Sequence, residues 1–221
     1  MIDFAAARRM MVDGQVHTAD VTDPRLLAAM LDLPRERFLP EDKAQLAYLD
    51  LDVRVSEPAA GARRMLKPMV LAKLIQAAAI GEGDHVLDVG CATGYSTAVL
   101  SRLAGSVVGL EEEPALARFA TEALAKTGVA NAKIMTGPLT RGLAGEGPYD
   151  VIVIEGAVEV IPDGLTDQLK NGGRLVCVLQ RGPAGRAMIY LRTGRDVSGR
   201  AVFDAVAAPL PGFAEAPTFV F

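Results

Sequence analysis

The residues of this chain best placed to do chemistry are an acid and the small-residue turn that follows it. Asp88 lies near the end of an apolar strand pattern at residues 85–89, and the turn contains Gly90, Cys91, Ala92 and Gly94. At the carboxyl end of a parallel strand, such a turn lets the backbone approach a ligand closely. The spacing GxAxG after an acid, in place of GxGxxG, favours a ligand without phosphates, and we expect S-adenosylmethionine. An ordinary strand-turn-helix junction is the alternative.

A second acid follows the next strand pattern. Glu111 comes 23 positions after Asp88, directly after the apolar residues 106–110. An acid at this place can accept hydrogen bonds from both ribose hydroxyls of a nucleoside. The alternative is a solvated acidic helix start at residues 111–113, favoured by the helix dipole. We expect Asp88 to meet the sulfonium or amino group of the cofactor, or else to cap the turn.

Strand and helix patterns alternate from about residue 69 onward. The expected strands cover residues 85–89, 106–110, 132–135, 151–154 and 174–179, and the expected helices cover residues 69–79, 93–103, 114–127 and 165–170. This alternation predicts an α/β fold with a mostly parallel sheet in a three-layer sandwich. Two helices at residues 4–16 and 24–31 precede it, and strands at 187–191 and 201–207 are expected to pair antiparallel at the sheet edge.

Composition narrows the classes of function. The chain has 221 residues, of which 50% are hydrophobic and 23% are charged, with a formal net charge of −4. It contains no apolar run long enough to cross a bilayer and no secretion signal, so we expect a cytoplasmic protein that binds no membrane. The negative net charge provides no broad positive field to attract nucleic acid, so we expect no nucleic-acid partner. Cys91 and Cys177 do not form a disulfide framework, and neither histidine has metal-ligand neighbours, so we assign no metal.

The ordered motifs of the whole chain resemble the protein-L-isoaspartate O-methyltransferase family, which has the class I, Rossmann-like methyltransferase fold. Besides the turn and Glu111, the resemblance rests on Arg9-Met10-Met11-Val12, Asp23-Pro24-Arg25, residues 34–40, residues 47–50, Tyr149-Asp150, Ile161-Pro162, residues 172–176 and Pro209-Leu210. It implies carboxyl methylation of abnormal isoaspartyl residues in damaged proteins, a repair step that uses S-adenosyl-L-methionine. A protein or peptide, or a small-molecule acceptor, would be the substrate.

The chain departs from the family pattern before the expected helix at residue 69. Counting back from Pro68, the family's active-site serine falls on Leu66, which cannot donate a hydrogen bond. Nearby Arg63, Arg64 and Lys67 could attract an anionic acceptor instead, or form a solvated basic turn. We therefore expect weak or altered activity on isoaspartyl substrates.

Two further departures lie after the third and fourth strands. Gly137-Pro138 replaces the family's glycine-aspartate pair, so the acid that helps recognise adenine is absent, and Pro138 has no amide donor. Glu155 stands where the family has a small or hydroxylic residue, and could bind a cationic group or face solvent. The simplest interpretation of Cys91 is a small residue in a tight turn, although a helix N-terminus can lower a thiol pKa.

The expected organisation is one methyltransferase domain over residues 1–221. Residues 1–68 form a helical lead-in on the substrate side and residues 69–221 form the Rossmann-like core, and a homodimer is possible. Arg63, Leu66, Lys67 and Glu155 are the candidate catalytic positions, and the cofactor candidates are Asp88, Gly90, Cys91, Ala92, Gly94, Glu111, Gly137 and Pro138. Two competing hypotheses are a non-catalytic binding or scaffold paralogue and a nucleotide oxidoreductase, which the GxAxG spacing disfavours.

Overall fold

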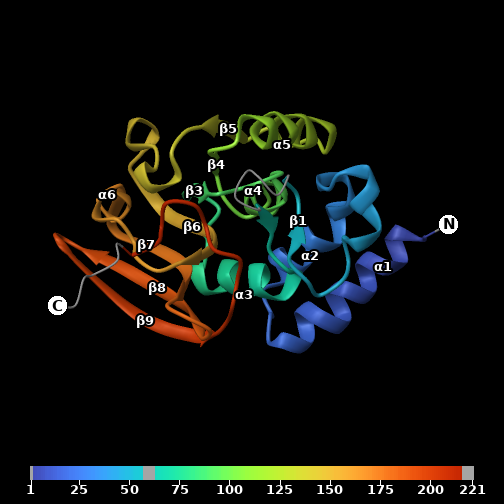
Figure 1. The fold of residues 1–221 in the computed structure, drawn as a ribbon, viewed down its shortest axis with the longest axis horizontal. Helices are drawn as coiled ribbons and strands as arrows, with labels where there is room; N and C mark the ends of the chain where they lie inside the picture. Colours follow the sequence, from blue (N-terminus) through green and yellow to red (C-terminus); the bar gives the residue numbers. More distant parts are fainter. Residues whose placement is uncertain (1, 57–62, 216–221) are drawn as a thin grey trace, which may run out of the picture.

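A seven-stranded sheet forms the centre of the computed structural model, which describes residues 2–56 and 63–215 (Figure 1). Its strands are β3 (His85–Val89), β4 (Ser106–Glu111), β5 (Ala132–Thr136), β6 (Tyr149–Val158), β7 (Leu169–Gln180), β8 (Gly185–Thr193) and β9 (Asp196–Asp204). They lie in the order β5-β4-β3-β6-β7-β8-β9. The strands from β5 to β7 pair in parallel, and β8 and β9 add an antiparallel hairpin at one edge. The predicted α/β class with an antiparallel edge is confirmed.

Alternate residues of the parallel strands pack into two separate apolar clusters, one on each face of the sheet. Along β3, Val86 belongs to the first cluster, whereas Leu87 and Val89 belong to the second. The first cluster takes in α3 (Pro68–Ala78), α4 (Tyr95–Ser101) and α5 (Pro114–Lys126), and the second takes in α6 (Asp163–Thr166) and the 3-10 turn η6 (Leu139–Arg141). Burial of both faces gives the three layers and explains the near-continuous apolar strands.

The N-terminal helices pack beside α3 and α4, on the right of Figure 1. They are α1 (Phe4–Met11), which continues as a π-helical turn η1 (Val12–Val16) and a 3-10 turn η2 (His17–Ala19), and α2 (Pro24–Asp32). Asp23 caps α2 as expected, because its side chain accepts from the amides of Arg25 and Leu26. The 3-10 turns η3 (Arg35–Phe38) and η4 (Glu41–Leu46) follow, and then β1 (Val53–Arg54) pairs antiparallel with β2 (Arg64–Met65).

Near the C-terminus, several boundaries differ from the prediction. The helix expected over residues 165–170 ends at Thr166, and β7 begins already at Leu169. Residues 171–173 lie within β7, where the β6–β7 pairing jumps from Tyr149↔Leu169 to Val151↔Arg174 and leaves the residues between them out of register. The last strand, expected over residues 201–207, is β9 at Asp196–Asp204. The 3-10 turn η7 (Ala144–Glu146) precedes β6. Among the described residues, no helix combines the length and apolar character needed to span a bilayer.

Gly109 of β4 lets the turn after β3 and helix α4 pack directly on the sheet. A Cβ atom built on Gly109 would lie 2.6 Å from Ile134 Cδ1, 2.9 Å from Thr97 Oγ1 and 3.1 Å from Cys91 Sγ. The glycine is therefore a packing requirement of the ligand-side edge of the sheet.

We predict that Gly109→Ala lowers the free energy of unfolding by about 1–3 kcal/mol, since overpacking a tight interior forces neighbours to shift. Urea denaturation measures the change. Gly83→Ala is the matched control because a Cβ there meets nothing within 4 Å. Equal midpoints for the two variants would show that the contact at Gly109 relaxes freely.

Candidate active site

The turn after β3 bends sharply enough to expose its backbone. Gly90, Ala92 and Gly94 have φ angles of 77°, 50° and 89°, in the left-handed region that side chains disfavour. The amides of Gly90 and Cys91 donate to the carbonyl of Leu110 at the end of β4, at 2.8 and 3.2 Å. The predicted small-residue turn is therefore anchored to the neighbouring strand, and its backbone faces the carboxyl ends of β3 and β4.

Glu111 lies at the carboxyl end of β4 and is fully buried. Its carboxylate accepts hydrogen bonds from the amides of Ala92, Glu112 and Glu113 at 2.8, 2.9 and 3.2 Å. The alternative of a solvated acidic helix start does not hold for Glu111. The same carboxylate thus fixes both the glycine turn and the start of α5, in the place where a ribose-binding acid is expected.

Arg63 contacts Glu111 from β2's side of the site. Its guanidinium lies 2.9 Å from Glu111 Oε2 through Nη2 and 3.3 Å from Oε1 through Nε, and Nη2 also donates to the Gly90 carbonyl at 2.8 Å. Only 3% of the Arg63 side chain is exposed. The structure thus excludes a solvated basic turn at Arg63, although residues 61 and 62 of the same motif lie outside the described residues.

Asp88 points toward the first turn of α4. Its Oδ2 accepts from the hydroxyls of Ser96 and Thr97 at 2.7 and 2.6 Å, while Oδ1 is buried with no hydrogen-bond partner among the described residues. Burial raises the pKa of Asp88 to about 6, against the two hydroxyl donors, which lower it. Asp88 therefore holds α4 with one oxygen and keeps the other available.

Glu155 joins the same buried group of charges. It follows Ile154, whose partner across the β3–β6 ladder is Val89, so Glu155 lies at the level of Gly90. Its side chain is buried, and Oε1 has no hydrogen-bond partner in the described part of the chain. Burial, reinforced by the charge of Asp88, raises the pKa of Glu155 well above its usual range. Glu155 does not face solvent.

Two residues of this environment have no place among the sequence candidates. Arg35 is fully buried, donates to the carbonyls of Ala47 and Leu66 at 2.8 and 2.5 Å, and lies over the Tyr95 ring, 4.6 Å from its centroid. Burial lowers the pKa of Arg35, and burial raises that of Tyr95. The only sequence signal was the arginine within an otherwise turn-like, proline-flanked segment at residues 34–40.

Leu66 and Lys67, the two remaining candidates before α3, lie in different environments. The Leu66 side chain is buried in the first apolar cluster, and its carbonyl accepts from Arg35. Lys67 precedes α3, and its amide donates to Asp52 Oδ1 at 2.8 Å. Leu66 is therefore a packing residue, whereas Lys67 extends toward the surface.

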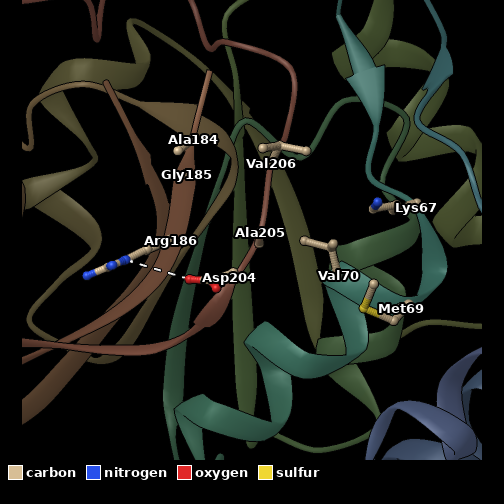
Figure 2. A pocket seen from close by; sticks show the side chains of 9 residues that line it. All are labelled: Lys67, Met69, Val70, Ala184, Gly185, Arg186, Asp204, Ala205 and Val206. Carbon is tan, nitrogen blue, oxygen red and sulfur yellow. Dashed lines mark ion pairs between the residues drawn. The ribbon is translucent and has the colours of Figure 1, made fainter. Parts of the chain in front are cut away.

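Lys67 lines two neighbouring surface hollows. The first, of about 430 Å³, lies between the start of α3 and the β8–β9 edge, where Arg186 pairs with Asp204 at 3.6 Å (Figure 2). The second, of about 360 Å³, shares Lys67 and Val206 with the first and extends to Pro209. Next along the chain, Leu210 packs over Gly90, at 3.2 Å from the position of a Cβ there. The second hollow therefore ends one residue before the side chain that packs over the glycine turn.

The remaining cofactor candidates occupy the turn and the end of β5. The Gly137 amide donates to the Glu111 carbonyl at 3.1 Å, and Pro138 begins the turn that buries Leu139. Cys91 is buried, and that burial raises its pKa well above the usual range, opposite to the lowering considered for a helix N-terminus. Cys91 is thus a packing residue of the turn.

Comparison with known proteins identifies the family. The profile of the Protein-L-isoaspartate(D-aspartate) O-methyltransferase (PCMT) family matches residues 7–206. The chain belongs to this family. It is 37% identical over 211 residues to Protein-L-isoaspartate O-methyltransferase 1 of Rhodopseudomonas palustris (strain HaA2), covering 95% of this chain and 84% of that protein. A PCMT protein of R. palustris (strain ATCC BAA-98 / CGA009) is 40% identical over 166 residues, or 75% and 74% of the two chains.

Solved PCMT structures share the fold. One protein-L-isoaspartate O-methyltransferase superposes with a TM-score of 0.81 at 23% identity, over 93% of this chain and 66% of that chain. A Plasmodium falciparum chain assigned to the same enzymes, in complex with S-adenosyl-L-homocysteine, gives 0.76 at 18% identity, over 91% and 98%. The predicted resemblance and the Rossmann-like methyltransferase fold are confirmed.

The raised pKa of Asp88 predicts a pH-dependent stability. The folded protein binds the proton of Asp88 more tightly than the unfolded chain does. The stabilisation that this proton provides is therefore complete below about pH 4 and is lost as the pH rises through about 6. Asp88→Asn should remove a decline on the order of 2–3 kcal/mol over this range. Urea titrations between pH 4 and 7 measure it, with the exposed Asp196→Asn as control. A wild-type decline equal to that of Asp88→Asn would contradict the assignment.

Proposed function

We propose that this protein transfers a methyl group from S-adenosyl-L-methionine to a carboxylate acceptor, and that its activity on isoaspartyl peptides is weak. The observation that carries the proposal is the buried Glu111 carboxylate beside the backbone of the glycine turn. A nucleoside ribose needs such an acid, and the turn admits a ligand close to the main chain. Membership of the PCMT family supports both the cofactor and the reaction class.

The polar groups around the turn fit the chemistry of this cofactor. Asp88 Oδ1 and Glu155 Oε1 are buried acceptors without partners among the described residues, and Thr93 Oγ1 is a third such atom. The Asp88 carboxylate suits the ammonium or sulfonium group of S-adenosylmethionine, because unlike charges attract strongly away from water. Adenine would find fewer hydrogen-bond donors, because Pro138 has no backbone N–H group. These features support cofactor binding of reduced affinity.

The chemistry needs positioning more than proton transfer. Bound S-adenosylmethionine supplies a methyl group on a sulfonium leaving group. An acceptor carboxylate is already anionic at neutral pH, so no general base is required, and the protein must align the acceptor oxygen with the methyl group. Glu155 in its protonated form would approach such an acceptor without charge repulsion, consistent with the burial that raises its pKa.

For the acceptor we propose the two hollows that share Lys67. The first is lined by Lys67 and by the Arg186–Asp204 ion pair, and the second by Lys67 and Arg64 together with Asp50 and Asp52. Lys67 is common to both hollows and would pair there with the carboxylate of a protein or peptide segment. The buried Leu66 leaves the acceptor without a hydroxyl donor at this position, which supports altered isoaspartyl activity.

The test of the function is methyl incorporation from labelled S-adenosylmethionine into an isoaspartyl peptide, with the aspartyl peptide of the same sequence as control. We expect slow incorporation into the isoaspartyl peptide alone. The second candidate, a non-catalytic paralogue, is favoured by the ion pair that already occupies Glu111. Failure of the wild-type protein to bind S-adenosylhomocysteine at millimolar concentration would support that candidate.

Glu111→Gln should weaken S-adenosylhomocysteine binding by about 10- to 100-fold, because a hydrogen bond to a charged group contributes about 1.5–3 kcal/mol. Calorimetric titration measures the change, and the exposed neighbour Glu112→Gln provides the matched control. If both variants bind like wild type, Glu111 does not hold the ribose.

Lys67→Gln should raise the KM for an anionic peptide acceptor by about two- to fivefold, the range for a partly solvated charge pair, with little change in kcat. The affinity for S-adenosylhomocysteine should stay the same. Lys126→Gln, an exposed substitution on α5, controls for a general loss of positive charge. An unchanged KM in Lys67→Gln would place the acceptor elsewhere.

A further inference from the structure

Glu111 has no hydrogen-bonding capacity left for a ligand. Its two oxygens accept five hydrogen bonds, three from backbone amides and two from the Arg63 guanidinium. An ionised carboxylate offers about four lone-pair sites. The amide bonds come from the turn and the start of α5, which shape the site itself. The only donor that a ribose could replace without unfolding the site is Arg63.

The same guanidinium also fills the space above the glycine turn. A Cβ built on Gly90 would lie 2.9 Å from Arg63 Nη2, so the close approach that this glycine permits is taken by Arg63. The backbone of Arg63 is held separately, because its amide donates to Ser56 Oγ at 2.8 Å and its carbonyl accepts from Val55 at 2.9 Å. The side chain can therefore leave Glu111 while the β1–β2 pairing stays in place.

From these contacts we infer that Arg63 is a built-in competitor of the cofactor: its guanidinium occupies the ribose position on Glu111 and must be displaced before a nucleoside with two vicinal hydroxyls can bind. This inference rests on the proposed cofactor-dependent function. Two hydroxyl donors replace two N–H donors on the same carboxylate, so Glu111 keeps its partners in both states. Arg63 thereby sets the affinity for the cofactor.

The exchange is also consistent with the charges buried around the turn. Among the described residues, the buried carboxylates of Asp88 and Glu111 lie near two buried arginines, Arg35 and Arg63, while burial keeps Glu155 protonated by raising its pKa well above the usual range. Removal of Arg63 from this group leaves an excess of buried carboxylates, which is unfavourable unless another cation enters. S-adenosylmethionine brings a sulfonium and an ammonium group. We therefore expect the exchange to favour S-adenosylmethionine over its uncharged-sulfur product.

The experiment measures S-adenosylhomocysteine binding by calorimetry in the wild type, Arg63→Met and Arg63→Lys. If Arg63 competes, Arg63→Met should bind at least about tenfold more tightly, because the competent fraction of the protein rises. Arg63→Lys keeps a cation but loses the two-pronged geometry, so an increase of about two- to fivefold is expected. It also serves if Arg63→Met fails to fold. Arg54→Met, an exposed arginine on β1 of the same hairpin, should leave the affinity unchanged.

A second measurement separates competition from a general structural effect. Methylguanidinium at millimolar concentration should weaken S-adenosylhomocysteine binding to Arg63→Met, by occupying Glu111 as Arg63 does, and should leave the wild type unaffected. A purely structural role for Arg63 gives no such difference between the two proteins.

Each outcome decides between the two proposals. Tighter binding in the Arg63 variants than in the wild type supports competition. Equal or weaker binding in folded variants overturns the competition and leaves the proposed function standing. No binding by any variant, including Arg54→Met and wild type, overturns the proposed function and the competition with it.

Discussion

The carboxylate of Glu111 connects the segments that make this site. It accepts from the amide of Ala92 in the turn, from the amides that start α5, and from Arg63 on the strand pair before α3. Each contact is local, yet together they fix the turn, the helix and the N-terminal region against one strand end. A charge buried this completely is tolerable only when it is fully hydrogen-bonded, so the arrangement constrains every neighbouring residue.

This constraint explains why the site contains so many charged groups without being a conventional surface cleft. Asp88 lies near the carboxyl end of β3, and Glu155 lies within β6, one residue past the last pair of the β3–β6 ladder at the centre of the sheet. Parallel strands bring their ends to one edge, so acids placed there must meet. Their raised pKa values follow from shared burial, and the two arginines supply the opposite charge. Fold topology, rather than sequence proximity, assembles the cluster.

The fold and the position of the turn could be predicted from sequence because their signals are local. Strand β3 has the predicted bounds, residues 85–89, and Pro114 and Asp23 start or cap helices where expected. The partner of Glu111 could not be predicted in this way, because Arg63 lies 48 positions away in the sequence and its two basic neighbours indicate a solvated turn. One signal was available: Arg63 and Met65 alternate with Arg64, which puts Arg63 on the buried face.

Two segments that depart from the family pattern meet at Glu111, because Arg63 pairs with its carboxylate and Gly137 donates to its carbonyl. Where the family resemblance predicts a hydroxyl, this chain has the apolar Leu66, which is packed in the core, and three residues earlier it has Arg63, which pairs with Glu111. Pro138 removes an amide donor after β5. Of these changes, the Arg63 contact satisfies a buried acceptor internally, which lowers the free energy of the protein without cofactor relative to the complex that we propose. On the proposal above, the activity depends on how readily Arg63 gives up Glu111.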